Sequence, residues 1–137
     1  MYNVCVFAGT TEGRELVSLL SGRGDIALTA CVATDYGETL LSPAENLTVL
    51  SGRMDEDEMV SLMRGRAFDL VVDATHPYAS AVTENISAAC GRTGCEYLRV
   101  LRRGSATGES AVFMPDIASA AAYLSERDGN ILLTTGS

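Results

Sequence analysis

The chain has 137 residues, of which 47% are hydrophobic and 20% are charged. This composition suits one globular domain with a real core, because a domain of this size buries about two-thirds of its unfolded surface. Ten basic residues against 18 acidic ones give a net charge of -8, which argues against binding to nucleic acids or anionic membranes. No apolar run reaches the roughly 18 residues of a membrane span, and the start is not typical of a signal peptide, so we expect a cytoplasmic protein.

All of the basic residues are arginines, so the chain has no lysine. This excludes the lysine-dependent phosphate loop, Schiff-base mechanisms and the Tyr-x-x-x-Lys pair of short-chain dehydrogenases. The four cysteines (Cys5, Cys31, Cys90 and Cys95) show no Cys-x-x-Cys spacing, and His76 is the only histidine. We therefore expect reduced, buried thiols and no metal site.

Short apolar runs alternate with helical patterns along the chain. Strands are expected at 2–8, 26–32, 47–50, 70–72, 97–101 and 130–133. Helices are expected at 12–21, from 55 through 63, from Pro77 to 90, and at 117–126. This alternation predicts an α/β fold: a Rossmann-like, doubly wound, mostly parallel sheet of five to six strands flanked by helices.

Apolar residues at helical spacing are expected to face the core. They are Leu16, Leu19 and Leu20 in the first helix, Met59, Leu62 and Met63 in the second, and Val82, Ile86, Ala89 and Cys90 in the third. Asp55 and Glu58 have the spacing of a capping box. The acidic run 55–58 is therefore interpreted as a helix start, where the macrodipole favours carboxylates, rather than as a metal site.

Polar residues gather directly after the predicted strands. They occupy residues 9–14, 34–37, 51–53, 73–78, 102–103 and 134–137. Because ligands in open parallel sheets bind beyond the carboxyl ends of the strands, these segments form the expected site.

The first of these segments, Gly9-Thr10-Thr11-Glu12-Gly13-Arg14, joins a buried strand to a helix start. Backbone N–H groups at such a position suit a phosphate or a carboxylate. The alternative is a glycine turn with a threonine cap, since the segment lacks the full Gly-x-Gly-x-x-Gly pattern. Asp35 follows the second strand, where it is either an ordinary loop residue or an acid that binds the ribose of a dinucleotide and favours NADH.

Two further groups stand out at this edge. His76 lies between Thr75 and Pro77 at the start of a predicted helix, and is either a helix cap or a site residue. Arg99, Arg102 and Arg103 are unusual in so acidic a chain. They either form a solvated strand end or bind an anionic ligand, because the arginine fork matches carboxylates.

Three segments together resemble the precorrin-6A reductase family, which includes the cobalt-precorrin-6A reductases. They are residues 7–16, residues 73–79 (Asp-Ala-Thr-His-Pro-Tyr-Ala) and residues 132–137 (Leu-Leu-Thr-Thr-Gly-Ser). The resemblance implies two Rossmann-like domains, with NADPH or NADH reducing a double bond of a corrin-ring precursor during cobalamin biosynthesis. A noncatalytic nucleotide-sensing domain that uses the same first loop is the alternative.

The resemblance and the edge positions together define the candidate site. The cofactor candidates are Gly9, Thr10, Thr11, Glu12, Arg14 and Asp35. The candidates for binding a tetrapyrrole substrate are Thr75, His76, Tyr78, Arg99, Arg102, Arg103, Thr135 and Ser137. His76 and Tyr78 are the titratable candidates for proton donation, with solvent as an equal competitor.

Members of this family are much longer than 137 residues, so the chain is expected to be the N-terminal half of a two-domain reductase that is inactive alone. Residues 130–137 are expected either to complete the first sheet or to belong to the second domain. In the latter case, an apolar strand without its native partners would promote self-association of the fragment.

Overall fold

The computed structural model describes residues 1–101, 115–126 and 129–130. The chain divides into two compact units, residues 1–103 and residues 104–137. In the second unit, helix α5 (Ile117–Ser125) follows Asp116, whose carboxylate accepts a hydrogen bond from the Ser119 N–H at 2.7 Å. Residues 131–133 of the last predicted strand lie outside the described residues, as do Arg102, Arg103, Thr135 and Ser137.

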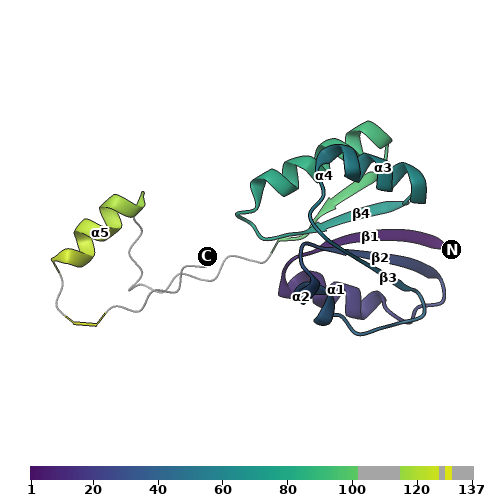
Figure 1. Cartoon of the computed structure of the whole chain (residues 1–137), viewed down its shortest axis with the longest axis horizontal. Helices are drawn as coiled ribbons and strands as arrows, with labels where there is room; N and C mark the ends of the chain where they lie inside the picture. Colours follow the sequence, from purple (N-terminus) through teal and green to yellow (C-terminus); the bar gives the residue numbers. More distant parts are fainter. Residues whose placement is uncertain (102–114, 127–128, 131–137) are drawn as a thin grey trace. The chain divides into compact units, whose positions relative to one another are not determined.

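The first unit is built on five parallel strands (Figure 1). They are β1 (Tyr2–Ala8), β2 (Ile26–Val32), β3 (Leu47–Ser51), β4 (Leu70–Ala74) and β5 (Glu96–Arg99). Their order is β3-β2-β1-β4-β5, and every neighbouring pair is parallel. This confirms the predicted α/β fold, and it places the reversal of strand order at β1.

Helices cover both faces of the sheet. They are α1 (Thr11–Leu20) and the short α2 (Asp35–Thr39) on one face, and α3 (Glu56–Arg66) and α4 (Ser80–Thr93) on the other (Figure 1). Strand β1 serves both cores because successive side chains point to opposite faces. Val4 and Val6 pack in the α1 core, whereas Cys5 and Phe7 pack in the core beneath α3 and α4.

Several helix details differ from the sequence expectation. The helix expected at Pro77 begins at Ser80, because the Ala79 N–H bonds to the His76 carbonyl at 2.9 Å and closes a turn first. Leu19 was expected in the core but is 76% exposed, since the buried face of α1 is centred on Gly13 and Val17. Val82 is also exposed, at the sheet-edge end of α4.

The ends of three strands also differ. Strand β4 continues to Ala74 and so contains Asp73, which had been assigned to the following loop. Strand β5 ends at Arg99 rather than at residue 101, and β3 extends to Ser51. The segment after β2, expected as a loop, forms α2, whose first turn is capped by the Thr34 hydroxyl.

Other local expectations are confirmed. Asp55 caps α3 in a complete capping box with Glu58. All four cysteines are free thiols; Cys5, Cys31 and Cys90 are buried and Cys95 is partly buried. Burial raises the pKa of Cys90 to about 11, and the hydrogen bond with Cys31, together with burial, raises the pKa of Cys5. Within the described residues, no helix is long and apolar enough to cross a membrane.

Candidate functional site

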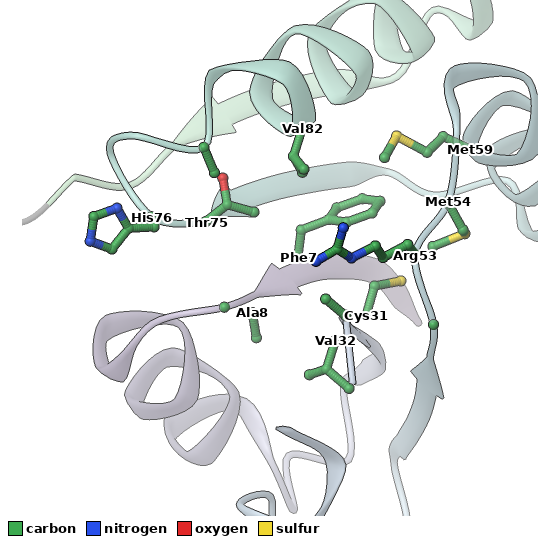
Figure 2. A pocket seen from close by; sticks show the side chains of 14 residues that line it. Phe7, Ala8, Cys31, Val32, Arg53, Met54, Met59, Thr75, His76 and Val82 are labelled. Carbon is green, nitrogen blue, oxygen red and sulfur yellow. The ribbon is translucent and has the colours of Figure 1, made fainter. Parts of the chain in front are cut away.

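A cavity of about 420 Å³ lies at the carboxyl ends of β1 and β2, beside the segments that follow β3 and β4 (Figure 2). Helices α3 and α4 contribute to its wall through Met59 and Val82. The structure thus brings together Gly9, Thr75 and His76, three of the predicted site residues. The full lining is Phe7, Ala8, Gly9, Cys31, Val32, Ala33, Gly52, Arg53, Met54, Met59, Thr75, His76, Ala79 and Val82.

The loop after β1 is tied to the end of β4 by Thr10. The Thr10 hydroxyl donates to the Ala74 carbonyl at 2.8 Å and accepts from the Gly13 N–H at 3.1 Å, so it caps α1. The Thr11 hydroxyl accepts from Arg14 at 3.1 Å. The threonine cap that the sequence offered as the alternative to an anion-binding loop is therefore present at the start of α1. The positive end of the α1 dipole also lies at the same sheet edge as the cavity.

Gly13 allows α1 to lie directly against the sheet. A Cβ atom added at this position would lie 2.9 Å from the Ala8 Cα, nearer than real Cβ atoms come to backbone. Gly9 is different, because a Cβ there would lie 3.8 Å from the Thr75 Cα, an ordinary contact distance. Gly13 is therefore required for packing, whereas Gly9 lines the cavity at a position where a Cβ would fit.

Asp35, the predicted ribose-binding acid, begins α2 and is exposed. Its carboxylate accepts a hydrogen bond from the Ser51 hydroxyl at 3.0 Å, which links the ends of β2 and β3. Asp35 is not among the residues that line the cavity around Gly9. Its contact with a ribose stays a prediction.

Asp73 is the most deeply buried charged residue near the cavity, with 0% of its surface exposed. Its carboxylate accepts from the Thr75 hydroxyl at 2.6 Å, the Tyr97 hydroxyl at 2.9 Å and the Arg99 guanidinium at 3.0 Å. Burial alone would raise the pKa of Asp73, but the hydrogen bonds from Thr75 and Tyr97 outweigh it and lower the pKa. Burial and the bond to Asp73 raise the pKa of Tyr97 to about 12.

Arg99 holds the backbone that follows β4. Its Nη1 also donates to the Asp73 carbonyl at 3.1 Å and the Thr75 carbonyl at 2.9 Å, and its Nη2 donates to the His76 carbonyl at 3.4 Å. The Arg99 side chain is only 18% exposed. Its binding of a substrate carboxylate stays a prediction, but the guanidinium is already engaged by the protein's own acceptors.

The segment that Arg99 holds presents His76 and Tyr78. The Tyr78 N–H donates to Nδ1 of His76 at 3.1 Å, and the two rings lie 5.2 Å apart. Because Nδ1 accepts this bond, the neutral imidazole that makes it carries its proton on Nε2. Tyr78 is 90% exposed. His76 lines the cavity and Tyr78 does not, and contact of either side chain with a ligand stays a prediction.

Sequence reasoning missed the roles of Asp73, Tyr97 and Arg53. A carboxylate at the end of an apolar strand indicates a buried charge, and a buried charge requires polar or charged partners. Those partners were not identifiable, since they depend on the pairing that places Asp73 opposite Arg99 and Val71 opposite Tyr97. Arg53 was noted after the third strand, but its place in the cavity lining comes from the tertiary structure.

The strand order, the helices on both faces and a cavity where the strand order reverses define a Rossmann-like α/β domain. A Rossmann-fold NAD(P)-binding family protein from Shigella flexneri has the same fold, with a TM-score of 0.58 over 72% of this chain and 50% of that one, at 19% identity. A solved CobK precorrin-6A reductase superposes with a TM-score of 0.69 at 25% identity, over 89% of this chain and 47% of that one.

The family model of precorrin-6x reductase CbiJ/CobK matches residues 3–137. The chain is 31% identical to a cobalt-precorrin-6A reductase of Priestia megaterium over 98% of this chain and 52% of the relative. It is 36% identical to that of Methanothermobacter thermautotrophicus over 73% of this chain and 33% of the relative. The chain belongs to the CbiJ/CobK precorrin-6A reductase family of cobalamin biosynthesis, and it spans about half the length of most of these relatives.

Proposed function

We propose that this chain is the N-terminal, Rossmann-like half of an oxidoreductase that uses NADPH or NADH to reduce a double bond of precorrin-6A or cobalt-precorrin-6A. The observation that carries the proposal is the cavity where the strand order reverses, with Gly9 on one side and Thr75 and His76 on the other. Membership in the CbiJ/CobK family supports the tetrapyrrole substrate.

The residues after β1 fit a dinucleotide. Gly9 lines the cavity and carries no side chain, so a ligand could come close to its backbone. Thr10 fixes the start of α1, whose N-terminal dipole favours a phosphate at this edge. When bound, the nicotinamide supplies the hydride, and the protein's task is to orient the reacting groups and to exclude water.

The segment after β4 contacts the tetrapyrrole in this proposal. Reduction of a carbon–carbon double bond needs a proton on the carbon next to the one that receives hydride. Nε2 of His76 and the Tyr78 hydroxyl are the candidate side-chain donors of this proton, with solvent as the competitor. Arg102 and Arg103 lie outside the described residues, and their contacts with substrate carboxylates stay predictions.

A complete active site needs a second domain in this proposal, because the relatives are about twice as long as the chain. In this proposal the fragment binds ligands but does not catalyse the reduction. It would gain activity when the missing C-terminal half of the same enzyme is supplied.

An absorbance and fluorescence titration of residues 1–137 with NADPH, NADH and uroporphyrin tests the function. Uroporphyrin is a tetrapyrrole polycarboxylate that serves as a substrate mimic. We expect saturable binding of a nicotinamide dinucleotide and of the porphyrin. Binding of the dinucleotide without the porphyrin would instead favour a nucleotide sensor, and binding of neither would contradict the proposal.

A further inference from the structure

The cavity has one positively charged side chain in its described lining. Arg53 contributes this charge, and the lining contains no Asp or Glu among the residues that the structure describes. Most other lining side chains are apolar, including Phe7, Val32 and Met54. Among the described lining residues, Arg53 is therefore the side chain whose charge an anionic ligand in this cavity would meet.

The arginines near this edge are not equally available to a ligand. Arg99 donates to the carboxylate of Asp73 and to three backbone carbonyls. Arg14 donates to the Thr11 hydroxyl. Arg53 is exposed and forms no salt bridge with a carboxylate in residues 1–101, 115–126 or 129–130.

The backbone after β3 directs Arg53 to the cavity. Gly52 has a φ of 120°, a conformation that favours glycine, and its N–H bonds to the Val32 carbonyl at 2.9 Å. The chain therefore turns at Gly52, and Asp55, the N-cap residue of α3, follows three residues later. Figure 2 shows the Arg53 side chain reaching from this segment toward the end of β1, where Phe7 lies.

We propose that Arg53 is the anion-binding residue of this cavity and that its guanidinium binds an oxyanion of the bound ligand. This inference rests on the proposed function, which supplies two sources of that oxyanion: a phosphate of the dinucleotide or a carboxylate of the tetrapyrrole. The planar fork of Arg53 matches either group with two parallel hydrogen bonds. In a chain with a net charge of -8, an anionic ligand needs such a local positive group.

The test compares three variants of the 137-residue chain: Arg53→Ala, Arg53→Lys and Arg64→Ala. Arg64 is the matched control, because it is an exposed arginine on α3 that does not line the cavity, and its loss changes the net charge equally. The probes are NADPH, NADH, uroporphyrin and inorganic pyrophosphate, each titrated by calorimetry. Circular dichroism melting curves verify that each variant is folded.

We expect Arg53→Ala to lower the affinity for at least one probe by roughly 10- to 100-fold. A loss of this size is typical when a hydrogen bond to a charged group is removed. Arg53→Lys should restore part of the affinity, and Arg64→Ala should bind as the parent does. If only the affinity for NADPH falls, the partner of Arg53 is the 2′-phosphate. If the affinities for NADPH and NADH fall equally, the partner is the pyrophosphate. If only the affinity for uroporphyrin falls, the partner is a carboxylate.

Parent-like binding of every probe by a folded Arg53→Ala variant would overturn the inference and leave the proposed function intact. Arg53-dependent binding of inorganic pyrophosphate, without binding of either dinucleotide or the porphyrin, would support the inference and contradict the proposed function. Failure of the parent to bind any probe would contradict both.

Discussion

Asp73 and Arg99 lie opposite each other on the neighbouring parallel strands β4 and β5, and Nη1 of Arg99 is 3.0 Å from Oδ1 of Asp73. The carboxylate is fully buried, and the guanidinium also donates to the carbonyls of Asp73, Thr75 and His76. The pair therefore joins the sheet to the segment that presents His76 to the cavity. A strand pairing in the core thus determines the geometry of the candidate site.

Removal of Arg99 is expected to destabilise the domain strongly. Arg99→Ala leaves the Asp73 carboxylate buried without its charge partner, which costs about 3–5 kcal/mol of unfolding free energy. The retained bonds from Thr75 and Tyr97 favour the lower part of that range. Urea denaturation measures the change. Arg92→Ala is the control, because Arg92 pairs with Glu56 and Asp57 on the surface and should change little. Equal effects of the two variants would contradict a special role for Arg99.

Asp73 should also make the free energy of unfolding depend on pH in the acidic range. Its pKa is lowered in the folded protein, so its charged form stabilises the fold. That contribution is present above the ordinary pKa of 3.8 and is lost as pH falls through the lower folded pKa. We expect stability to fall below about pH 4 in the parent. In urea denaturation from pH 2 to 6, Asp73→Asn should reduce this fall in the free energy of unfolding. An unchanged fall would show that other carboxylates cause it.

Tyr97 should cause a separate loss of stability at alkaline pH. Burial and the bond to Asp73 raise its pKa from 10.0 to about 12, so the neutral phenol is the form that stabilises the fold. Its contribution is complete below pH 10, falls as pH rises above 10 and is lost through pH 12. Absorbance of tyrosinate during an alkaline titration should show one tyrosine ionising late. Tyr97→Phe should remove that late step; its persistence would assign the step to another tyrosine.

Gly13→Ala tests the close packing of α1 on β1. The added Cβ would lie 2.9 Å from the Ala8 backbone, so the helix must shift, at a cost of about 1–3 kcal/mol. Gly65→Ala is the matched control, because Gly65 lies within α3 and a Cβ there meets nothing within 4 Å. The control should be stabilised by about 0.5–1 kcal/mol through helix propensity. Thermal and urea unfolding compare the two, and stabilisation of Gly13→Ala would contradict the packing argument.

Gly9 tests ligand approach rather than folding. A Cβ fits at this position, 3.8 Å from the Thr75 Cα, so both Gly9→Ala and Gly9→Val should fold. The branched valine should abolish binding of a dinucleotide by blocking close approach, whereas alanine should weaken it less. Calorimetric titration with NADPH and NADH, beside circular dichroism, provides the measurement. Parent-like binding by a folded Gly9→Val variant would exclude the first loop as the contact.

The class of fold and the sheet edge of the candidate site follow from patterns that are local in the sequence. The apolar runs that became β1 and β2 and the capping box at Asp55 are local patterns, and their positions are confirmed within a residue. The family was indicated by three short contiguous segments together, of which residues 73–79 are the most specific. These features depend on neighbouring residues along the chain.

Which polar side chains bond within the protein, and which remain available to a ligand, depends on contacts between segments distant in the sequence. Arg99 and Arg53 are equally charged in the sequence, but Arg99 lies opposite Asp73 across a strand pair whereas Arg53 lines the cavity. Asp73 was expected in a loop and is instead in β4, because its charge is stabilised by Tyr97 and Arg99 from β5. The apolar pattern of a strand determines which of its faces is buried, but which strand distant in sequence it pairs with is decided only when the whole sheet packs.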